Sequence, residues 1–392
     1  MSKYITDTVK NNLKSITKGL TRPQEKAIKE VVRGLLTEGT PILRHLVQDE
    51  SKTAKKQAEK YSHHLRNVDL MEIVEKLALK QAKKGINKYT IIAYDLSDIN
   101  KDAAREMEKL KHVFDGSKRK TCNGYTFHGV GINHLLVKAE IHDSDKTFLP
   151  QIRRRIVTET SKKLDGKGVW VFDRGNDDKQ FFYFLRRELD ANFIARLKSN
   201  RQIVIIKTGV MSKVKDLKVG QYDVYLMNRN NNKVDPENRY RLVIYTHLKN
   251  KEPIRLLTTL PKKRFSKLQI VNMYLERWGI ENSFKRVKQK FNLEKIRVLK
   301  HQTFLNLIAL TLFALLISTL IFQKIQQMNQ ELIASVLMLY KRFIKLKSLA
   351  FNLDSFISFI QSTLPKLTYR NHDPPDQLNL FSRRGLVKLG SF

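Results

Sequence analysis

Hydrophobic and polar residues follow a helical spacing through the first part of the chain, residues 1–86. Local signals mark where two of these helices begin. Thr21 stands just before Pro23, and Asp69 and Glu72 have the spacing of a capping box. A glycine follows each of the two helices, as is common at helix ends. The pattern therefore predicts a small helical domain.

After residue 86 the pattern becomes that of short apolar strands alternating with helices. The β-rich run 89–94 leads to Asp95, and the run 169–172 leads in the same way to Asp173. Residues 125–137 have the pattern of a further strand or hairpin. Strands alternating with helices predict an α/β domain, in which reactive groups commonly lie at the ends of strands.

The alternation is interrupted between residues 201 and 261. Four β-rich runs lie there, separated by turn-like stretches such as NRNNNKVDPEN. We therefore expect an antiparallel β insertion within the α/β domain. A charged helix is expected from about Ser266, and further helices are expected from residue 326 onward.

One segment, residues 303–322, is long and apolar enough to cross a bilayer. It also carries Asn306, Thr311, Ser318 and Thr319, stands alone, and lies close to the charged helix. We therefore expect a buried core helix and no membrane partner. The first residues lack the apolar run of a signal peptide, which predicts an intracellular protein.

The net charge of the chain indicates which kind of molecule it binds. The 392 residues include 74 Lys and Arg against 38 Asp and Glu, a formal net charge of +36, so the expected partner is a polyanion. Because 41% of the residues are hydrophobic, we expect a folded protein and not a basic disordered tail. The single cysteine, Cys122, excludes an intrachain disulfide, and no Cys/His cluster has the spacing of a zinc finger.

The stretch 51–67 is short, basic and expected to be helical. Its side chains available to phosphates include Lys55, Lys56, Lys60 and Arg66, which indicates a helical DNA-binding domain. The alternative is a helical cap with a solvated basic face.

The most specific pattern is Tyr274-x-x-Arg277-x-x-x-Glu281-x-x-x-x-x-x-Lys288. On one regular helix, at about 100° per residue, these four side chains fall within an arc of roughly 60°. A carboxylate among cations beside an aromatic suits an enzyme that holds Mg²⁺ against a DNA backbone. The alternative is a solvated helix face with an i,i+4 ion pair between Arg277 and Glu281.

Asp95, Asp173 and Glu281 supply three carboxylates from separated positions. Oxygen-only ligands favour Mg²⁺ or Mn²⁺ over zinc, and two such ions sharing Asp95 would promote an in-line displacement at phosphorus. The alternative role for either aspartate is to cap the turn or helix that follows it. Asp98 competes with Asp95 as the ligand, although Asp95 directly follows the apolar run.

The order of these features resembles the cut-and-paste DDE transposases of the Insertion Sequence Four family over roughly residues 88–325. The resemblance implies a ribonuclease-H-like catalytic fold in which Asp95, Asp173 and Glu281 bind two Mg²⁺ ions, with Mn²⁺ as a substitute. Family members act as dimers on paired element ends, so we expect a homodimer on double-stranded DNA. The residues expected to contact that DNA are Tyr274, Arg277, Lys288, Lys285, Arg174, Lys55, Lys56 and Arg66.

The expected fold is an α/β protein with helical regions at both ends. Its parts are a helical DNA-binding domain (1–86), the first part of a ribonuclease-H-like catalytic domain (87–200), a β-strand insertion (201–261), the second part of the catalytic domain with the Glu281 helix (262–325), and a C-terminal helical region with a tail (326–392).

The expected function is Mg²⁺-dependent transposition: cleavage at the inverted repeats of a mobile element and strand transfer to target DNA. The expected location is the cytoplasm of a bacterial or archaeal cell, at the nucleoid. The alternatives are a structure-selective DNA nuclease on the same fold and a domesticated, non-catalytic DNA-binding protein.

Two features depart from the family pattern. Asn176 stands where the family often has a tyrosine after Asp-Arg-Gly. Relatives use an aromatic of the insertion, prominently tryptophan, to hold a flipped base during hairpin formation, but Trp170 and Trp278 both lie outside 201–261. The remaining candidates for stacking on a base are Tyr222, Tyr225 and Tyr240.

The tail segment 377–381 resembles the peptide by which bacterial replication and repair proteins dock on the sliding clamp. The anchors would be Gln377, Leu380 and Phe381. The alternative is an apolar tail that packs on its own domain.

Overall fold

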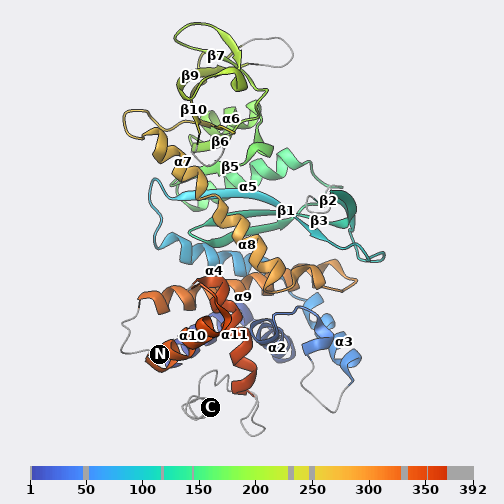
Figure 1. The fold of residues 1–392 in the computed structure, drawn as a ribbon. Coiled ribbons are helices and arrows are strands. Elements are labelled where there is room, and N and C mark those ends of the chain that lie inside the picture. The colour runs from blue at the N-terminus through green and yellow to red at the C-terminus, as the bar shows by residue number, and fades with distance from the viewer. Residues whose placement is uncertain are drawn as a thin grey trace. The chain divides into compact units, whose positions relative to one another are not determined.

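The chain divides into two compact units. Figure 1 labels their helices and strands. Unit 1 comprises Met1–Ala78, Asp98–Tyr125 and Phe284–Phe392, and unit 2 comprises Leu79–Ser97 and Thr126–Ser283. The computed structural model describes residues 2–46, 53–115, 119–143, 145–227, 234–246, 252–327, 334–350 and 352–368. The expected division into five segments stays a prediction.

Unit 1 is built mainly from helices. They are α1 (Ser2–Thr17), α2 (Arg22–Glu38), η1 (Leu43–Leu46), α3 (Ala54–Arg66), η5 (Leu293–Lys295), α9 (His301–Gln327), α10 (Ala334–Lys347) and α11 (Leu353–Thr368). Thr21 precedes α2 and donates its backbone N–H to the Gln24 side chain at 3.0 Å. Gly39 ends this helix in the left-handed conformation, with φ 60°. The helix signals at Thr21 and Gly39 are therefore confirmed.

The helix expected after Asp69 begins later than predicted. This helix, α4 (Met71–Lys83), starts after Leu70, whose carbonyl accepts the Val74 N–H at 3.0 Å. Leu70 is buried, and its own N–H donates to the Asn306 side chain at 2.9 Å. A tertiary contact thus holds the backbone at the start of α4, one residue beyond the start expected from Asp69.

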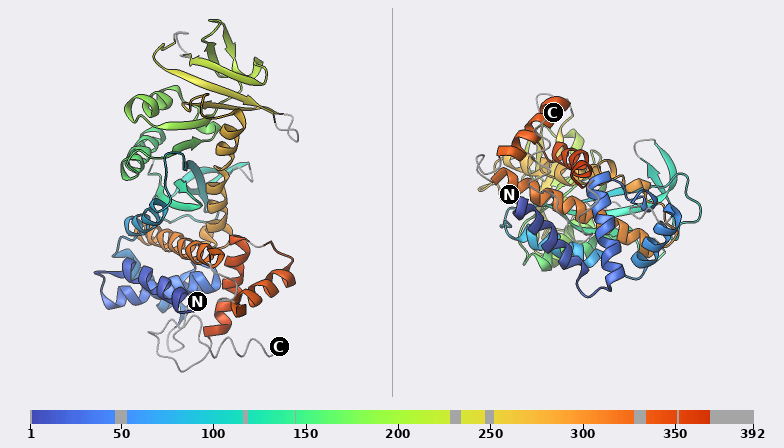
Figure 2. Two further views of the ribbon diagram at one scale, coloured as in Figure 1. Left: turned by 90° about the vertical axis from the view of Figure 1, so that its left-hand side faces the viewer. Right: turned by 90° about the horizontal axis from the view of Figure 1, so that it is seen from below.

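The long apolar segment forms α9, which packs against α2 and α3 (Figure 2). By length and composition alone α9 passes as a membrane span, but 89% of its most apolar window is buried inside the protein. The Asn306 amide donates to the Leu65 and Val68 carbonyls, each at 2.8 Å. Helix α9 therefore forms part of the core of unit 1, and the Asn306 side chain has its hydrogen bonds supplied by neighbouring segments.

The chain contains a mixed sheet in the order β2-β3-β1-β5-β6-β11-β10-β9-β7-β8, with β4 paired to β3. Its strands are β1 (Ile91–Asn100), β2 (Lys111–Asp115), β3 (Lys120–Ile132), β4 (Leu135–Ile141), β5 (Val169–Phe172), β6 (Asn192–Arg196), β7 (Gln202–Ile205), β8 (Met211–Lys213), β9 (Gly220–Leu226), β10 (Arg239–Tyr245) and β11 (Ile254–Thr258). β2 belongs to unit 1, and β1 and β3 run from one unit into the other.

Within unit 2, β1, β5 and β6 are parallel, whereas β11 pairs antiparallel with β6 and continues into β10 and β9. The antiparallel strands expected in 201–261 are therefore present, and they extend the sheet. The remaining elements of unit 2 are α5 (Leu149–Lys163), η2 (Arg174–Asn176), α6 (Lys179–Tyr183), η3 (Phe184–Glu188), η4 (Val214–Asp216) and α7 (Lys267–Leu275), and α8 (Trp278–Gln289) runs from unit 2 into unit 1.

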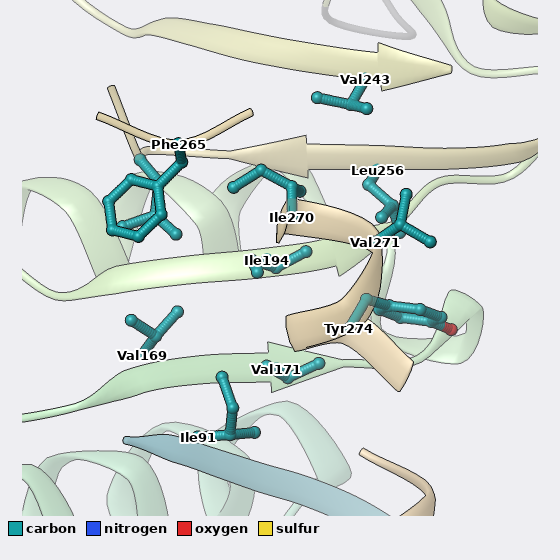
Figure 3. Close-up of a cluster of buried hydrophobic side chains, with 11 residues drawn as sticks. Ile91, Val169, Val171, Ile194, Val243, Leu256, Phe265, Ile270, Val271 and Tyr274 are labelled. Atoms are coloured by element: carbon teal, nitrogen blue, oxygen red, sulfur yellow. The ribbon is translucent and has the colours of Figure 1, made fainter. Parts of the chain in front are cut away.

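An apolar cluster holds α7 against the parallel strands (Figure 3). Ser266 starts α7 by accepting the Gln269 N–H at 3.2 Å, and the Gln269 side chain accepts the Ser266 N–H at 2.8 Å. Burial of this cluster is what fixes the helix on the sheet, because apolar area removed from water is the main stabilising contribution in a protein core. Its members are Ile91, Val169, Val171, Ile194, Val243, Leu256, Leu260, Phe265, Ile270, Val271 and Tyr274.

Two sequence predictions about the site-bearing elements are wrong. β1 continues to Asn100, so Asp95 lies within a strand and not at its end, because extended backbone continues to the fully buried Ile99. The helix expected from Tyr274 to Lys288 is interrupted between α7 and α8. There Arg277 donates its N–H to the Tyr274 carbonyl, a tighter i→i+3 bond, so the arc derived for one regular helix does not hold.

A buried histidine makes unit 2 sensitive to acid. His128 Nδ1 lies 2.7 Å from the Tyr94 hydroxyl, and its buried Nε2 has no hydrogen-bond partner among the described residues. Burial, aided by the nearby charges of His142 and Arg155, lowers the pKa of His128 to about 3. Because the unfolded chain binds this proton near pH 6.5, the contribution of His128 to stability is present above pH 6.5 and is lost as the pH falls towards 3.

His128→Gln, which keeps a polar group and does not titrate, should therefore lose less stability than the wild type between pH 7 and pH 4.5. Urea unfolding followed by tryptophan fluorescence measures this, because Trp170 and Trp278 both belong to unit 2. Equal losses in the two proteins would show that His128 binds no proton on unfolding.

Candidate active site

Asp95 lies on β1, with its side chain 14% exposed, and is bound by Arg277. Arg277 Nη1 donates to Asp95 Oδ2 at 2.9 Å, and Asp95 Oδ1 accepts the Leu96 N–H at 2.9 Å. The same guanidinium reaches Glu281, with Nη2 2.5 Å from Oε1. The i,i+4 ion pair considered from the sequence is therefore present, and it forms part of a bridge between two of the three predicted metal ligands.

Asp173 lies beside Asp95 in the sheet topology. Tyr94 of β1 is in register with Phe172 of β5, and the two strands are parallel. Asp95 and Asp173 are the residues that directly follow this pair, one on each chain segment. The pairing of two neighbouring parallel strands thus places the two aspartates close together.

The pKa of Asp95 is raised by burial and by two neighbouring carboxylates. Burial is the main cause that raises the pKa of Asp95 to about 7, against the opposing effect of Arg277. The charges of Asp173 and Glu281 raise it further. Asp95 therefore interacts with an acid from each of two other parts of the sequence, and the single guanidinium does not offset the cost of keeping Asp95 charged.

The chemistry of these three acids fits a divalent ion, because hard cations such as Mg²⁺ prefer carboxylate oxygens. In the part of the chain that the structure describes, however, no three His, Cys, Asp or Glu residues are grouped closely enough to hold a metal. Arg277 contacts both Asp95 and Glu281 in this arrangement. Asp95, Asp173 and Glu281 thus supply suitable oxygen donors, and Arg277 is paired with two of them.

The other predicted DNA contacts are distributed over both units. Tyr274 is buried in the cluster of Figure 3, and Arg277 lies over its ring, 5.6 Å from the centroid. Arg174 is exposed in the turn after Asp173. Helix α3 of unit 1 exposes Lys55, Lys56 and Arg66. Unit 1 also contains Lys285 and Lys288, which lie on α8. Their contacts with DNA stay predictions.

The sequence also suggested aromatic residues that could stack on a flipped base and tail residues that could bind a sliding clamp. Tyr240, a candidate for stacking on a base, is buried, whereas Tyr222 and Tyr225 are half-buried. Trp278, which is not in the insertion, is 58% exposed at the start of α8. The proposed clamp-binding residues, Gln377, Leu380 and Phe381, lie outside the described residues.

Sequence analysis missed the residues that surround Asp173. Asn176 donates to the Asp173 carboxylate, and Arg153 of α5 donates to Asn176. Asp177 forms a buried ion pair with Arg201, at the start of the strands of the insertion. The acids were visible in the run Asp-Arg-Gly-Asn-Asp-Asp, but nothing in the sequence indicated which arginine meets which of them.

Comparison with known proteins defines the class to which this fold and site belong. Residues 87–317 match the family described as the Transposase DDE domain, and this region includes Asp95, Asp173 and Glu281. Because the match covers more than half of the chain, the chain belongs to that family.

Two individual proteins are similar to this chain. One is the "Putative transposase for insertion sequence element IS4SA" of Synechocystis sp. (strain ATCC 27184 / PCC 6803 / Kazusa), 28% identical over 168 residues, which are 42% of this chain and 43% of that protein. The other is a piggyBac transposase in a synaptic complex with hairpin DNA, solved by cryo-EM. It has 10% identity and a TM-score of 0.46, and the match covers 99% of this chain and 82% of that one.

Proposed function

We propose that this protein is a DNA transposase that depends on Mg²⁺ or Mn²⁺, cuts at the ends of a mobile element and joins the freed 3′-hydroxyls to target DNA. One observation carries the proposal: Asp95 and Asp173 follow a register pair of adjacent parallel strands, and Arg277 links Asp95 to Glu281. All four residues lie in the region that matches the transposase family. The mixed sheet, with parallel strands at its centre, supports a ribonuclease-H-like catalytic fold.

The proposed roles follow from the chemistry of each side chain. Asp95, Asp173 and Glu281 would hold the divalent ions, which supply charge stabilisation and an activated oxygen nucleophile for displacement at phosphorus. Arg277 is held among these acids and would offer its guanidinium to a phosphate of the element end. The net charge of +36 supports a double-stranded DNA partner, and a homodimer on paired ends stays a prediction.

The basic face of α3 gives a test of DNA binding that does not involve catalysis. The double variant Lys55→Ala/Lys56→Ala should reduce the slope of log affinity against log salt by about 1.8, because each phosphate contact releases roughly 0.9 counterion. Lys76→Ala is the matched control, since Lys76 is equally exposed and is already paired with Glu72 at 2.6 Å. If the double variant and Lys76→Ala both show the same salt dependence of DNA affinity as the wild type, α3 does not contact the DNA.

A strand-transfer assay tests the function itself. The inverted repeats can be identified by sequencing the DNA that flanks the gene, and labelled repeat ends are then incubated with the protein, Mg²⁺ and a target plasmid. A transposase yields ends joined to the plasmid, a nuclease yields cut ends alone, and a DNA-binding protein leaves the ends intact. Repeat ends that are bound but never cut would contradict the proposed function.

A further inference from the structure

The Asp173 carboxylate is held by a neutral donor and not by a cation. Asn176 Nδ2 donates to Asp173 Oδ1 at 2.5 Å, and the Asn176 backbone N–H donates to the Asp173 carbonyl at 3.2 Å. Asn176 therefore folds back on Asp173 across the single turn η2, and its side chain is buried there. Asp95 differs, because its partner is the charged Arg277.

Arg153 determines which way the Asn176 amide points. Arg153 Nη1 donates to Asn176 Oδ1 at 3.1 Å. A guanidinium can only donate hydrogen bonds and an ionised carboxylate can only accept them, so the amide oxygen must face Arg153 and the amide nitrogen must face Asp173. The guanidinium thus selects one of the two orientations of the Asn176 amide.

Arg153 is itself fixed from two sides. Its Nη2 donates to Asp178 Oδ2 at 2.8 Å, and its guanidinium lies over the Phe181 ring, 3.8 Å from the centroid. The other oxygen of Asp178 accepts the Gln180 N–H at 2.9 Å at the start of α6. The guanidinium is therefore anchored to the helix that follows the Asp173 turn.

Gly175 brings the backbone close to the same carboxylate. A Cβ at position 175 would lie 3.3 Å from both Asp173 Oδ1 and Oδ2. Such a contact is tighter than an ordinary van der Waals contact, so the absence of a side chain at Gly175 lets the carboxylate lie over the turn. Asn176 and Gly175 thus constrain the position of Asp173 independently.

We propose that Asn176, oriented by Arg153, is a positioning residue that presents Asp173 to a divalent ion. The amide occupies Oδ1 without neutralising the carboxylate, so the full negative charge and Oδ2 stay available to the ion. An arginine in direct contact would hold Asp173 equally well but would compete with the ion for its charge. This inference rests on the proposed function in one respect, the role of Asp173 as a metal ligand.

The chain contains a matched control for this arrangement. Asn238 is also buried, donates from Nδ2 to the carboxylate of Asp235 three residues earlier, and accepts from Arg187 Nε at 3.1 Å. Its backbone N–H donates to the Asp235 carbonyl at 3.0 Å, as in the Asp173 turn. The turn is therefore a structural unit in its own right, and the copy at Asp173 is the one that follows the strand paired with β1, which carries Asp95.

The test is Mn²⁺ binding to the full chain, measured by electron paramagnetic resonance, with thermal unfolding as a check of folding. Asn176→Ala should weaken Mn²⁺ binding by about 10- to 100-fold, and Asn238→Ala should leave it unchanged. Arg153→Met should weaken binding as well, whereas Arg153→Lys, which keeps a donor, should recover most of the affinity. Gly175→Ala, which presses on the carboxylate with the amide in place, should cause a smaller loss.

Asp173→Ala separates failure of this inference from failure of the proposed function. If Asp173→Ala abolishes Mn²⁺ binding and Asn176→Ala has no more effect than Asn238→Ala, the positioning role is wrong and the metal role stands. If Asp173→Ala leaves Mn²⁺ binding unchanged, Asp173 is no ligand and both proposals are overturned.

Discussion

Asp173→Asn and Glu281→Gln should each lower the rate of cleavage at element ends by roughly a thousandfold or more. Each change removes a charged oxygen donor, and charge stabilisation by a bound metal is worth several kcal/mol, with about 1.4 kcal/mol for each factor of ten in rate. Single-turnover cleavage of labelled repeat ends in Mg²⁺ measures the effect. Binding of the same DNA should change only a few-fold, because the amides keep the size of the side chains.

Glu276→Gln is the matched control for this series. Glu276 is an exposed acid that lies just before Arg277, in the same charged segment as Glu281. Its replacement should leave cleavage within a few-fold of the wild-type rate. A large loss in Glu276→Gln together with normal cleavage by Glu281→Gln would move the third ligand from residue 281 to residue 276.

Arg201→Met should destabilise unit 2 by about 3–5 kcal/mol, since it leaves the Asp177 charge buried without its partner. The Arg201 and Asp177 side chains are 6% and 0% exposed, respectively. Arg201 Nε donates to Asp177 Oδ1 at 2.9 Å and Nη2 donates to the Asp177 carbonyl at 2.9 Å, while Oδ2 accepts the Lys198 N–H at 2.8 Å. The pair ties the start of the insertion to the turn that carries Asp173.

Urea unfolding followed by tryptophan fluorescence measures this loss, and two variants serve as controls. Arg239→Met breaks the exposed pair with Asp223 and should cost at most about 1 kcal/mol. The double variant Arg201→Met/Asp177→Leu removes both buried charges and should recover much of the loss. A cost for Arg201→Met no larger than that for Arg239→Met would show that the pair does not hold the turn in place.

The sequence predicted well the features that depend on neighbouring residues. The cap at Thr21, the strand that leads to Asp173 and the antiparallel strands of 201–261 all follow from short-range preferences, and the structure contains them. The expected proximity of Asp95 and Asp173 came from the chemistry of a shared metal site, whereas their neighbourhood in the structure comes from the pairing of β1 with β5, which the sequence did not indicate.

The features that were missed depend on contacts between distant residues. Arg277 meets Asp95 across 182 residues, and the break between α7 and α8 accompanies this contact. The Arg277–Glu281 spacing alone fitted a surface ion pair as well as it fitted a metal site. From the sequence alone Asn176 is only a departure from the family pattern, because its partner Arg153 lies on a separate helix, 23 residues away.

The central claim is that Asp95, Asp173 and Glu281 together hold the divalent ions. Fe²⁺ bound in place of Mg²⁺ on the complex with element-end DNA, treated with ascorbate and peroxide, generates hydroxyl radicals that cut the adjacent protein backbone. We predict cuts in three segments, around residues 95, 173 and 281, which excess Mg²⁺ suppresses. Cuts confined to other parts of the chain, or cuts at these three segments that Mg²⁺ does not suppress, would contradict the claim.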